Sequence, residues 1–477
     1  MPNNDRIIVG IDVGTHKICT IVAEADSASG NRLNVLGAGA VASEGVAKGM
    51  ITDIVKASSS IEHSLEAAER QSGCRILSAY VSMSGNHISS LNSRGLVSVA
   101  HPDRVIGADD VARAVDAARA IALPAGRDVL HVVPRTYTID GQEGIRNPVG
   151  LSGFRLDVET HVVTGASNVR ENLIRCVQKA NVEVDDLVLS PLASAEAVLT
   201  EQEKNLGVVH VDIGHGTTDI AIYVEGSVWH TKVLPIGGWQ LTNDLVIVFN
   251  IPYEAAEALK LQYGLAFAPG SDKQAQPVTQ PASANGKSHP GGAGHTAHAA
   301  GSQNGHAAEY SSNGRATLEA IEARTGHDED EEMLEAETFE GATRLIRRDE
   351  LNEVMAARLE QLFSMIGDEV RRSGYEGLLP AGVVLTGGVA AMSGMESLAS
   401  GKLRMPVRIG RPRRIGGLAE AFESPAYATS VGLILWGMKQ GITPQPGTSR
   451  LATGRPKVGE EQLGLLTKWL KRFLPQA

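Results

Sequence analysis

Two segments of the chain, about 200 residues apart, share a pattern of residue types that could bind phosphate. In both, a β-branched run reaches an aspartate, passes through a turn of glycine and threonine, and continues into a second β-branched run. The segments read Val9-Gly10-Ile11-Asp12-Val13-Gly14-Thr15 and Val211-Asp212-Ile213-Gly214-His215-Gly216-Thr217-Thr218-Asp219. A β-hairpin that occurs twice predicts a molecule with two related halves.

The residue types explain what such hairpins could do. Glycine lets the backbone approach a phosphate closely, and successive N–H groups in the turn form an anion-binding concavity. The hydroxyls of Thr15, Thr217 and Thr218 add donors. Asp12 and Asp212, at the strand ends, could hold Mg²⁺ through water or orient an attacking water. One copy alone would read as an ordinary tight turn, whereas two facing copies could clamp a triphosphate.

A third element has a related character. Residues 383–390 read as a buried strand that ends in Gly387-Gly388, where a flat purine or ribose could lie on bare backbone. A tight strand-to-helix turn explains this segment equally well. The sequence contains no Gly-x-x-x-x-Gly-Lys-Ser/Thr motif, and no Gly-x-Gly-x-x-Gly follows a strand.

Composition limits the class of protein. The 477 residues carry a net charge of −11, which argues against a general nucleic-acid binder. Three cysteines without metal-ligand spacing suit a reducing compartment. We find no signal peptide and no apolar stretch near the ~18 residues of a spanning helix. We therefore expect a cytoplasmic body whose membrane contact, if any, is a surface anchor.

The elements around the motifs alternate between strand and helix, which indicates a buried mixed sheet. Strands are expected at 7–13, 18–23, 77–83 and 208–213, and helices at 54–70, 190–203 and around 351–366. Residues 86–163 read as an inserted α+β domain, with strands at 97–99, 129–133 and 136–139 and a helix at 109–122. Residues 269–313 are too poor in apolar side chains to fold, so we expect a disordered insertion there.

The last segment reads as an amphipathic helix that lies on an anionic membrane. At about 100° per residue, its apolar face comprises Leu463, Leu466, Trp469, Leu470, Phe473 and Leu474. The opposite side carries Lys468, Lys471 and Arg472. A helix docked on the protein's own core is the alternative, but the Gly/Pro-rich linker before it favours the membrane.

Two phosphate hairpins and a Gly-Gly adenosine loop are the signature of the superfamily of actin, hexokinase and heat-shock chaperones. Within it, the sequence closely resembles the FtsA family of bacterial cell division proteins, over residues 7–263 and 344 onward. The segments that carry the resemblance are Gly45–Gly49, Val81–Ile88, His131–Pro134 and Gln142–Gly153. The last is highly specific and lies in the inserted domain, called 1C in that family.

The resemblance implies an α/β, actin-like (ribonuclease-H-like) duplicated fold with the inserted 1C subdomain and the C-terminal amphipathic helix. We accordingly divide the chain into 1A (1–85 and 165–195), 1C (86–164), 2A (196–236 and 346–438), 2B (237–345, with the insertion at about 269–330), a linker (439–460) and the membrane helix (461–477).

By motif match, the resemblance also implies which residues bind ATP and Mg²⁺. The first phosphate loop is Asp12, Gly14, Thr15, His16 and Lys17, and the second is Asp212, Gly214, His215, Gly216, Thr217 and Thr218. Gly387 and Gly388 form the adenosine loop, and Glu257 and Lys260 match a helix of 2B that faces ribose and purine. Asp212 and Glu196 match positions that could polarise a water, which leaves slow hydrolysis or none open.

One departure stands out, because His215 replaces a glycine usual in the family. The implied function is an adaptor at the cytoplasmic face of the cell membrane, at the division site. It would form filaments, bind the C-terminal peptide of the tubulin-like FtsZ through 2B, and recruit further division proteins. The alternatives are a pilus-assembly adaptor resembling PilM, a sugar-kinase-like enzyme and a chaperone-like ATPase.

Overall fold

The computed structural model describes residues 6–26, 32–101, 103–266, 332–413, 415–417 and 422–441. The chain divides into two compact units, one of Met1–Thr242 with Ala357–Ala477 and one of Asn243–Ala356. The predicted insertion, most of the linker and the predicted membrane helix lie outside the described residues.

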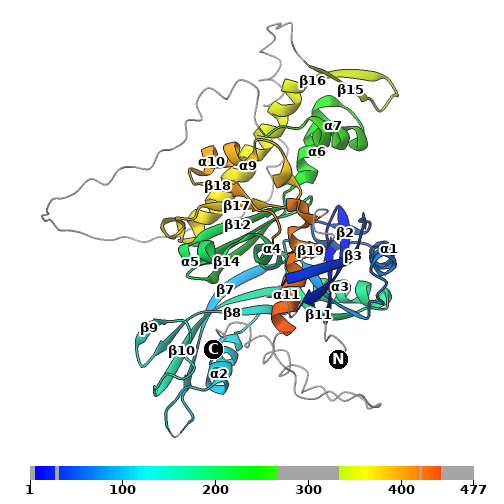
Figure 1. Ribbon diagram of the computed structural model, residues 1–477. Helices are drawn as coiled ribbons and strands as arrows, with labels where there is room; N and C mark the ends of the chain where they lie inside the picture. The colour runs from blue at the N-terminus through cyan, green and yellow to red at the C-terminus, as the bar shows by residue number, and fades with distance from the viewer. Residues whose placement is uncertain are drawn as a thin grey trace, which may run out of the picture. The chain divides into compact units, whose positions relative to one another are not determined.

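The first half of the larger unit is built on a six-stranded sheet with the order β11-β6-β1-β2-β3-β19 (Figure 1). β1 runs antiparallel to β2 and parallel to β6, and β6 runs parallel to β11. The interior positions of β1 and β2 are mostly β-branched, and Ile11, Ile18 and Ile21 are fully buried. The strands are β1 (Arg6–Val13), β2 (Lys17–Asp26), β3 (Arg32–Ala42), β6 (Ser78–Met83), β11 (Glu183–Leu189) and β19 (Ile415–Gly417).

The second half repeats this arrangement in a five-stranded sheet with the order β14-β13-β12-β17-β18. β12 runs antiparallel to β13 and parallel to β17, as β1 does to β2 and β6. Position by position, β3-β2-β1-β6-β11 corresponds to β14-β13-β12-β17-β18, so the predicted duplication is confirmed. The strands are β12 (Val208–Ile213), β13 (Thr218–Val224), β14 (Ser227–Leu234), β17 (Val383–Thr386) and β18 (Val407–Ile409).

Helices and short elements of the larger unit cover these sheets. Their bounds are β4 (Val46–Ala47), β5 (Met50–Ile51), α1 (Ile54–Ser72), α3 (Ser167–Lys179), α4 (Ser190–Val198), α5 (Glu201–Leu206), η2 (Glu376–Leu378), η3 (Val389–Ala391), α10 (Met395–Leu403), η5 (Pro425–Tyr427) and α11 (Ala428–Gly441).

The single helix expected at 190–203 is two helices. α4 ends at Val198, and Thr200 starts α5 with a capping box in which its hydroxyl accepts from the Glu203 N–H and Glu203 accepts from the Thr200 N–H. The Thr-x-x-Glu pattern was the signal for this break.

α11 brings the end of the described chain back to the first half, where it packs on β1 and α4. Glycine makes this approach possible. A Cβ at Gly10 would lie 2.8 Å from Leu433 Cβ, and one at Gly432 would overlap the Ala193 carbonyl oxygen of α4. Leu433 and Ile434 of α11 are fully buried.

The inserted domain is a four-stranded sheet with the order β7-β10-β8-β9 and one covering helix, drawn in blue to cyan in Figure 1. Its elements are β7 (Ser89–Ser98), α2 (Ala108–Arg119), β8 (Arg127–Ile139), β9 (Gln142–Ile145) and β10 (Arg155–Ala166). β8 is one long strand where the sequence predicts two, because Pro134 fits beside a register shift against β10.

The smaller unit contains most of α6 (Gly238–Phe249), then α7 (Tyr253–Tyr263), a hairpin of β15 (Met333–Glu337) and β16 (Thr343–Arg347), and the start of α9 (Arg348–Ser373). α9 is the long helix expected from the apolar spacing at 351–366. Asn352 on α9 accepts a hydrogen bond from the Leu265 N–H at 2.8 Å.

Candidate functional site

The two predicted hairpins have the same turn. In the first, the Gly14 N–H donates to the Lys17 carbonyl at 3.1 Å, and in the second, the Gly214 N–H donates to the Thr217 carbonyl at 2.9 Å. Asp12 and Asp212 each lie two residues before the first glycine of their turn. Across the hairpins, Asp12 pairs with Cys19 and Asp212 pairs with Asp219. The two turns share this hydrogen bond as well as their sequence pattern, so their backbones are arranged alike at the site.

The two turns lie against each other within the larger unit. A Cβ at Gly216 would lie 2.6 Å from Thr15 Oγ1 and 3.1 Å from the Cα of Lys48. Only a residue without a side chain lets the turns come this close. The imidazole rings of His16 and His215 also meet, with their centroids 4.8 Å apart.

Hydroxyl groups hold the two predicted aspartates in place. Asp12 accepts from Ser82 Oγ at 2.8 Å and from Ser430 Oγ at 3.1 Å. Asp212 accepts from Thr429 Oγ1 at 2.9 Å. Burial raises the pKa of Asp12, and it raises the pKa of Asp212 to about 6, although these hydrogen bonds oppose the shift.

Lys17 lies beside the aspartates. Its Nζ donates to the Ala426 carbonyl at 2.7 Å and lies 3.4 Å from the centre of the Tyr427 ring. Burial lowers the pKa of Lys17, and the charges of Asp12 and Asp212 act in the opposite direction. One half-buried cation therefore faces the carboxylates of both halves.

A third carboxylate, Asp219, belongs to the same site and was not among the predicted residues. It is buried at the start of β13 and accepts from Ser84 Oγ at 2.6 Å. Burial and the nearby Asp212 raise its pKa to about 8. The sequence signal was present, because Asp219 closes the second motif at the position that faces Asp212 across the hairpin.

The predicted adenosine loop touches the second aspartate. Gly387 has a φ of +90°, and a Cβ there would lie 2.5 Å from Asp212 Oδ1. Its N–H donates to the Pro425 carbonyl at 3.2 Å. Gly387 is buried, whereas Gly388 is exposed.

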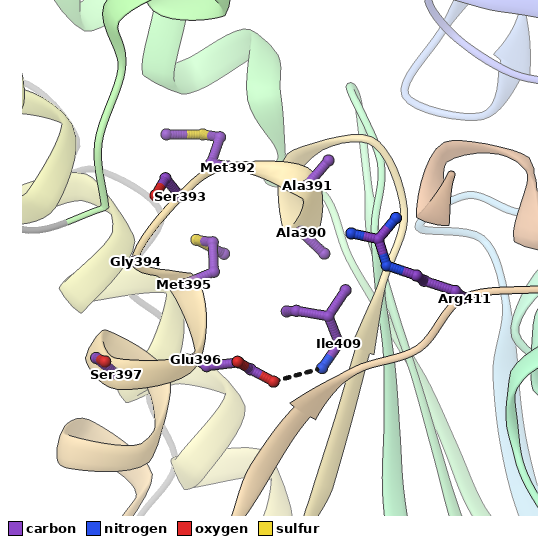
Figure 2. Close-up of a pocket in the computed structure, with 10 residues that line it drawn as sticks. All are labelled: Ala390, Ala391, Met392, Ser393, Gly394, Met395, Glu396, Ser397, Ile409 and Arg411. Atoms are coloured by element: carbon purple, nitrogen blue, oxygen red, sulfur yellow. Dashed lines mark hydrogen bonds between the residues drawn. The ribbon is translucent and has the colours of Figure 1, made fainter. Parts of the chain in front are cut away.

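A cavity of about 300 Å³ opens immediately after this loop in the chain (Figure 2). It lies between residues 390–397, which lead into α10, and the segment of Ile409 and Arg411. Glu396 closes one side by accepting from the Ile409 N–H at 3.0 Å. None of the predicted phosphate-loop or adenosine-loop residues lines it.

Three other predicted site residues have different surroundings. Glu196 on α4 accepts from Lys204 Nζ at 3.3 Å and also from Lys439 on α11. Glu257 and Lys260 lie on α7 in the smaller unit, where Lys260 Nζ donates to Glu257 at 2.6 Å. These two side chains are paired with each other, as expected of neighbours on a helix face.

Comparison with known proteins identifies the family to which this chain belongs. Residues 209–432 match the family model described as cell division protein FtsA, and residues 85–164 match the model of the SHS2 domain inserted in FtsA. The chain is 39% identical to the cell division protein FtsA of Pseudomonas aeruginosa over 469 residues, or 98% of this chain and 97% of that protein. The chain belongs to the FtsA family.

Further relatives agree with this assignment. FtsA of Escherichia coli K12 is 31% identical over 476 residues, or 98% of this chain and 96% of that protein. A structure described as the PilM–PilN type IV pilus biogenesis complex shares the fold, with a TM-score of 0.57 and 14% identity over 90% of this chain and 98% of that one. The predicted fold class, actin-like with an inserted domain, is confirmed.

Membership of the FtsA family gives this chain a role in cell division and, through the actin-like ATPase fold, indicates nucleotide binding. No helix among the described residues is long and apolar enough to cross a membrane.

The site fits a magnesium nucleotide. Gly216 and Gly387 carry no Cβ that would press on Thr15 Oγ1 or Asp212 Oδ1, so these polar atoms lie close to the turns, whose amides can face phosphate oxygens. In the described part of the chain, no three His, Cys, Asp or Glu side chains are grouped to hold a metal directly. Asp12 and Asp212 would instead hold Mg²⁺ through water molecules.

Proposed function

We propose that this FtsA-family chain binds Mg-ATP between its two phosphate hairpins, forms filaments, and tethers FtsZ to the cytoplasmic face of the cell membrane at the division site. One observation carries the nucleotide part. Asp12 and Asp212, from equivalent hairpins of the two halves, accept hydrogen bonds from the adjacent residues Ser430 and Thr429.

Different residues of the site contact different parts of the nucleotide. The turn amides that follow Gly14 and Gly214 face the phosphates, and Thr15 and Thr217 supply further polar groups. The predicted donor Thr218 instead gives its hydroxyl to the Ile236 carbonyl at 2.8 Å. Asp12 and Asp212 would hold Mg²⁺ through its waters, and the bound ion would neutralise phosphate charge. Lys17 offsets the two carboxylates. Gly387 and Gly388 accept the adenosine.

Calorimetry with Mg-ATP tests this site. We expect Asp12→Asn and Asp212→Asn to weaken binding at least about tenfold, which corresponds to about 1.4 kcal/mol. Asp368→Asn is the matched control, because Asp368 is half-exposed and pairs with Arg371 on the surface of α9. No heat with the wild-type chain, or equal affinity in all variants, would refute the nucleotide site.

Hydrolysis is proposed to be slow or absent. Glu196, one candidate to polarise a water, is paired with Lys204 and Lys439, which hold its carboxylate between α4, α5 and α11. Asp212 remains the other candidate. A phosphate-release assay with and without lipid measures the rate, and turnover faster than about 1 s⁻¹, the low end for enzymes, would contradict the proposal.

The membrane part rests on the sequence of residues 463–474. Six apolar residues oppose Lys468, Lys471 and Arg472, and each basic residue contributes about 1 kcal/mol near an anionic surface. A single short helix binds weakly, and filament formation multiplies the attachment. Deletion of Leu463–Ala477 should abolish pelleting with anionic vesicles and leave Mg-ATP binding intact. Pelleting that is unchanged, or equal with neutral vesicles, excludes this anchor.

For the proposed tethering of FtsZ, we place the binding site for the C-terminal peptide of FtsZ on the smaller unit. Exposed apolar side chains are available there, with Ile247 61% and Leu261 73% exposed. Ile247→Glu and Leu261→Glu should weaken peptide binding, measured by fluorescence anisotropy. Leu206→Glu is the control, since Leu206 is equally exposed (62%) but lies on α5 of the larger unit. Binding that is insensitive to both variants places the peptide elsewhere.

A further inference from the structure

The loop that follows β6 is the counterpart, in the first half, of the adenosine loop that follows β17 in the second. Val81 of β6 and Leu385 of β17 each pair with the residue just before the aspartate of the neighbouring strand. Three residues further along, Ser84 therefore corresponds to Gly388. Gly388 belongs to the predicted adenosine loop, whereas Ser84 begins the connection to the inserted domain. The duplication thus places the entrance of the inserted domain beside the aspartates.

Ser84 contacts the second phosphate hairpin directly. Its hydroxyl donates to Asp219 Oδ1 at 2.6 Å and lies 3.4 Å from the Thr217 hydroxyl. Ser84 belongs to the first half, and the other two residues belong to the second, so this contact joins the halves. Gly49 packs behind Ser84, because a Cβ at Gly49 would lie 2.9 Å from the Ser84 carbonyl oxygen. A shift of the second hairpin therefore reaches Ser84.

The residues after Ser84 form a tight turn. The Ile88 N–H closes it by donating to the Gly85 carbonyl at 3.1 Å. Gly85 has a φ of +131°, which favours glycine, and a Cβ there would lie 3.0 Å from His87 Cδ2. The imidazole thus packs over the backbone of its own turn. A closed turn of this kind passes a displacement of Ser84 on to His87 and does not absorb it.

His87 lies where the two connections of the inserted domain meet. The chain enters the domain through the turn that contains His87 and leaves it after Ala166, at the end of β10. His87 Nδ1 accepts from the Ala166 N–H at 3.3 Å. Arg127 Nη2 donates to the carbonyls of His87 and Thr164, both at 3.0 Å. These bonds tie the entering segment to the leaving one, so the two form a single hinge.

We propose that the turn from Ser84 to Ile88 couples occupancy of the second phosphate hairpin to the hinge of the inserted domain. This inference rests on the proposed nucleotide site and goes beyond it, because it assigns the inserted domain a response to the nucleotide. A nucleotide on the hairpin fixes Thr217 and Asp219, Ser84 follows them, and both connections tighten. By linkage, a partner that binds the tightened domain more strongly also raises the affinity for nucleotide.

Hydrogen exchange on the full chain, measured by mass spectrometry with and without saturating Mg-ATP, tests the coupling. We expect Mg-ATP to slow exchange at residues 85–92 and 164–167 at least about fivefold, the lower end of typical coupling between sites. Ser84→Ala should remove this slowing, and Ser84→Thr, which keeps the hydroxyl, should retain it. Calorimetry sets the saturating concentration for each variant, so that a weaker affinity is not read as a loss of coupling.

Arg127→Met interrupts the coupling at its other end, since it keeps the apolar stem and removes the donors to both connections. We expect unchanged Mg-ATP affinity and no slowing. Arg113→Met is the matched control, because Arg113 donates to the Ser98 carbonyl at 3.0 Å, a contact within the inserted domain. It should behave as wild type.

The outcomes separate the two proposals. If wild type binds Mg-ATP but exchange at the two connections does not change, the coupling is refuted and the nucleotide site stands. The same holds if the slowing survives in Ser84→Ala and Arg127→Met, which would make the contact with β14 the route. If wild type binds no Mg-ATP, both proposals fall. Thermal unfolding checks that the variants fold, and Arg127→Met decides alone if Ser84→Ala does not.

Discussion

Thr429 and Ser430 are consecutive in the chain and donate to aspartates of opposite halves. Thr429 reaches Asp212, 217 residues away, and Ser430 reaches Asp12, 418 residues away. Both belong to the first turn of α11, which also packs on β1. A single helix start therefore fixes the two carboxylates in a common frame.

Removing these hydroxyls should weaken the site without unfolding it. In Thr429→Val and Ser430→Ala, a buried carboxylate loses a donor, which costs about 1–3 kcal/mol. We expect Mg-ATP affinity to fall several-fold, by calorimetry, and the thermal midpoint to drop by a few degrees. Ser364→Ala is the control, since Ser364 is exposed on α9 and donates to the Glu360 carbonyl of the same helix. Full affinity in both variants would show that the aspartates do not need this support.

Stability should decrease as the pH rises from about 5 to 8. Burial raises the pKa of Asp212 to about 6 and that of Asp219 to about 8, from 3.8. Across this interval the folded protein binds more protons than the unfolded chain, so the free energy of unfolding falls, by up to about 1.4 kcal/mol per pH unit for each group.

Asp219→Asn removes one of these groups and should flatten the decrease between pH 6 and pH 8. Chemical denaturation at pH 5, 6.5 and 8 measures it, with Asp368→Asn as the exposed control. Parallel curves for wild type and Asp219→Asn would mean that Asp219 is ionised throughout.

Gly387 should not tolerate a side chain. Its φ of +90° disfavours other residues, and a Cβ would press on Asp212 Oδ1. We expect Gly387→Ala to lower the thermal midpoint and to weaken Mg-ATP binding. Gly401→Ala on α10, where nothing lies within 4 Å of a new Cβ, should instead stabilise by up to about 1 kcal/mol. Similar effects of both changes would argue against a special role for Gly387.

Arg135 should tie the inserted domain to the second sheet. Its guanidinium lies 3.9 Å from the centre of the Trp229 ring on β14, and Trp229 meets Tyr375 edge-on at 5.2 Å. Arg135→Ala should cost about 1–2 kcal/mol and speed hydrogen exchange where β7 and β10 contact β14.

Arg104→Ala is the matched control for that exchange experiment. Arg104 lies 3.8 Å from the Phe154 ring, a contact wholly inside the inserted domain. Its loss should leave exchange at β14 unchanged. Equal exchange in both variants would mean that the domain is held by its other contacts, such as His161 to Thr231 at 3.0 Å.

The sequence predicts the hairpins well because their chemistry is local. Asp12, Gly14, Asp212 and Gly214 lie within a few residues of the turns they define, so spacing alone reveals them. Ser82, Thr429 and Ser430 sit in segments with no motif of their own. Only the fold brings them to the aspartates.

The helices show the same contrast between features that a local pattern predicts and features that it does not. The apolar spacing of α9 predicts a long helix, whereas the break after Val198 depends on a cap that competes with helix propensity. Glu257 and Lys260 are predicted from the family resemblance alone, and their placement against a nucleotide stays a prediction.

The position of α11 has a mechanical consequence. It is the last described element before residues 442–477, which include the proposed membrane anchor. Tension applied to that tail enters the folded body through α11, whose opposite end holds Asp12 and Asp212. If the proposed anchor holds a filament on the membrane, a pull on it would reach the two aspartates along this one helix.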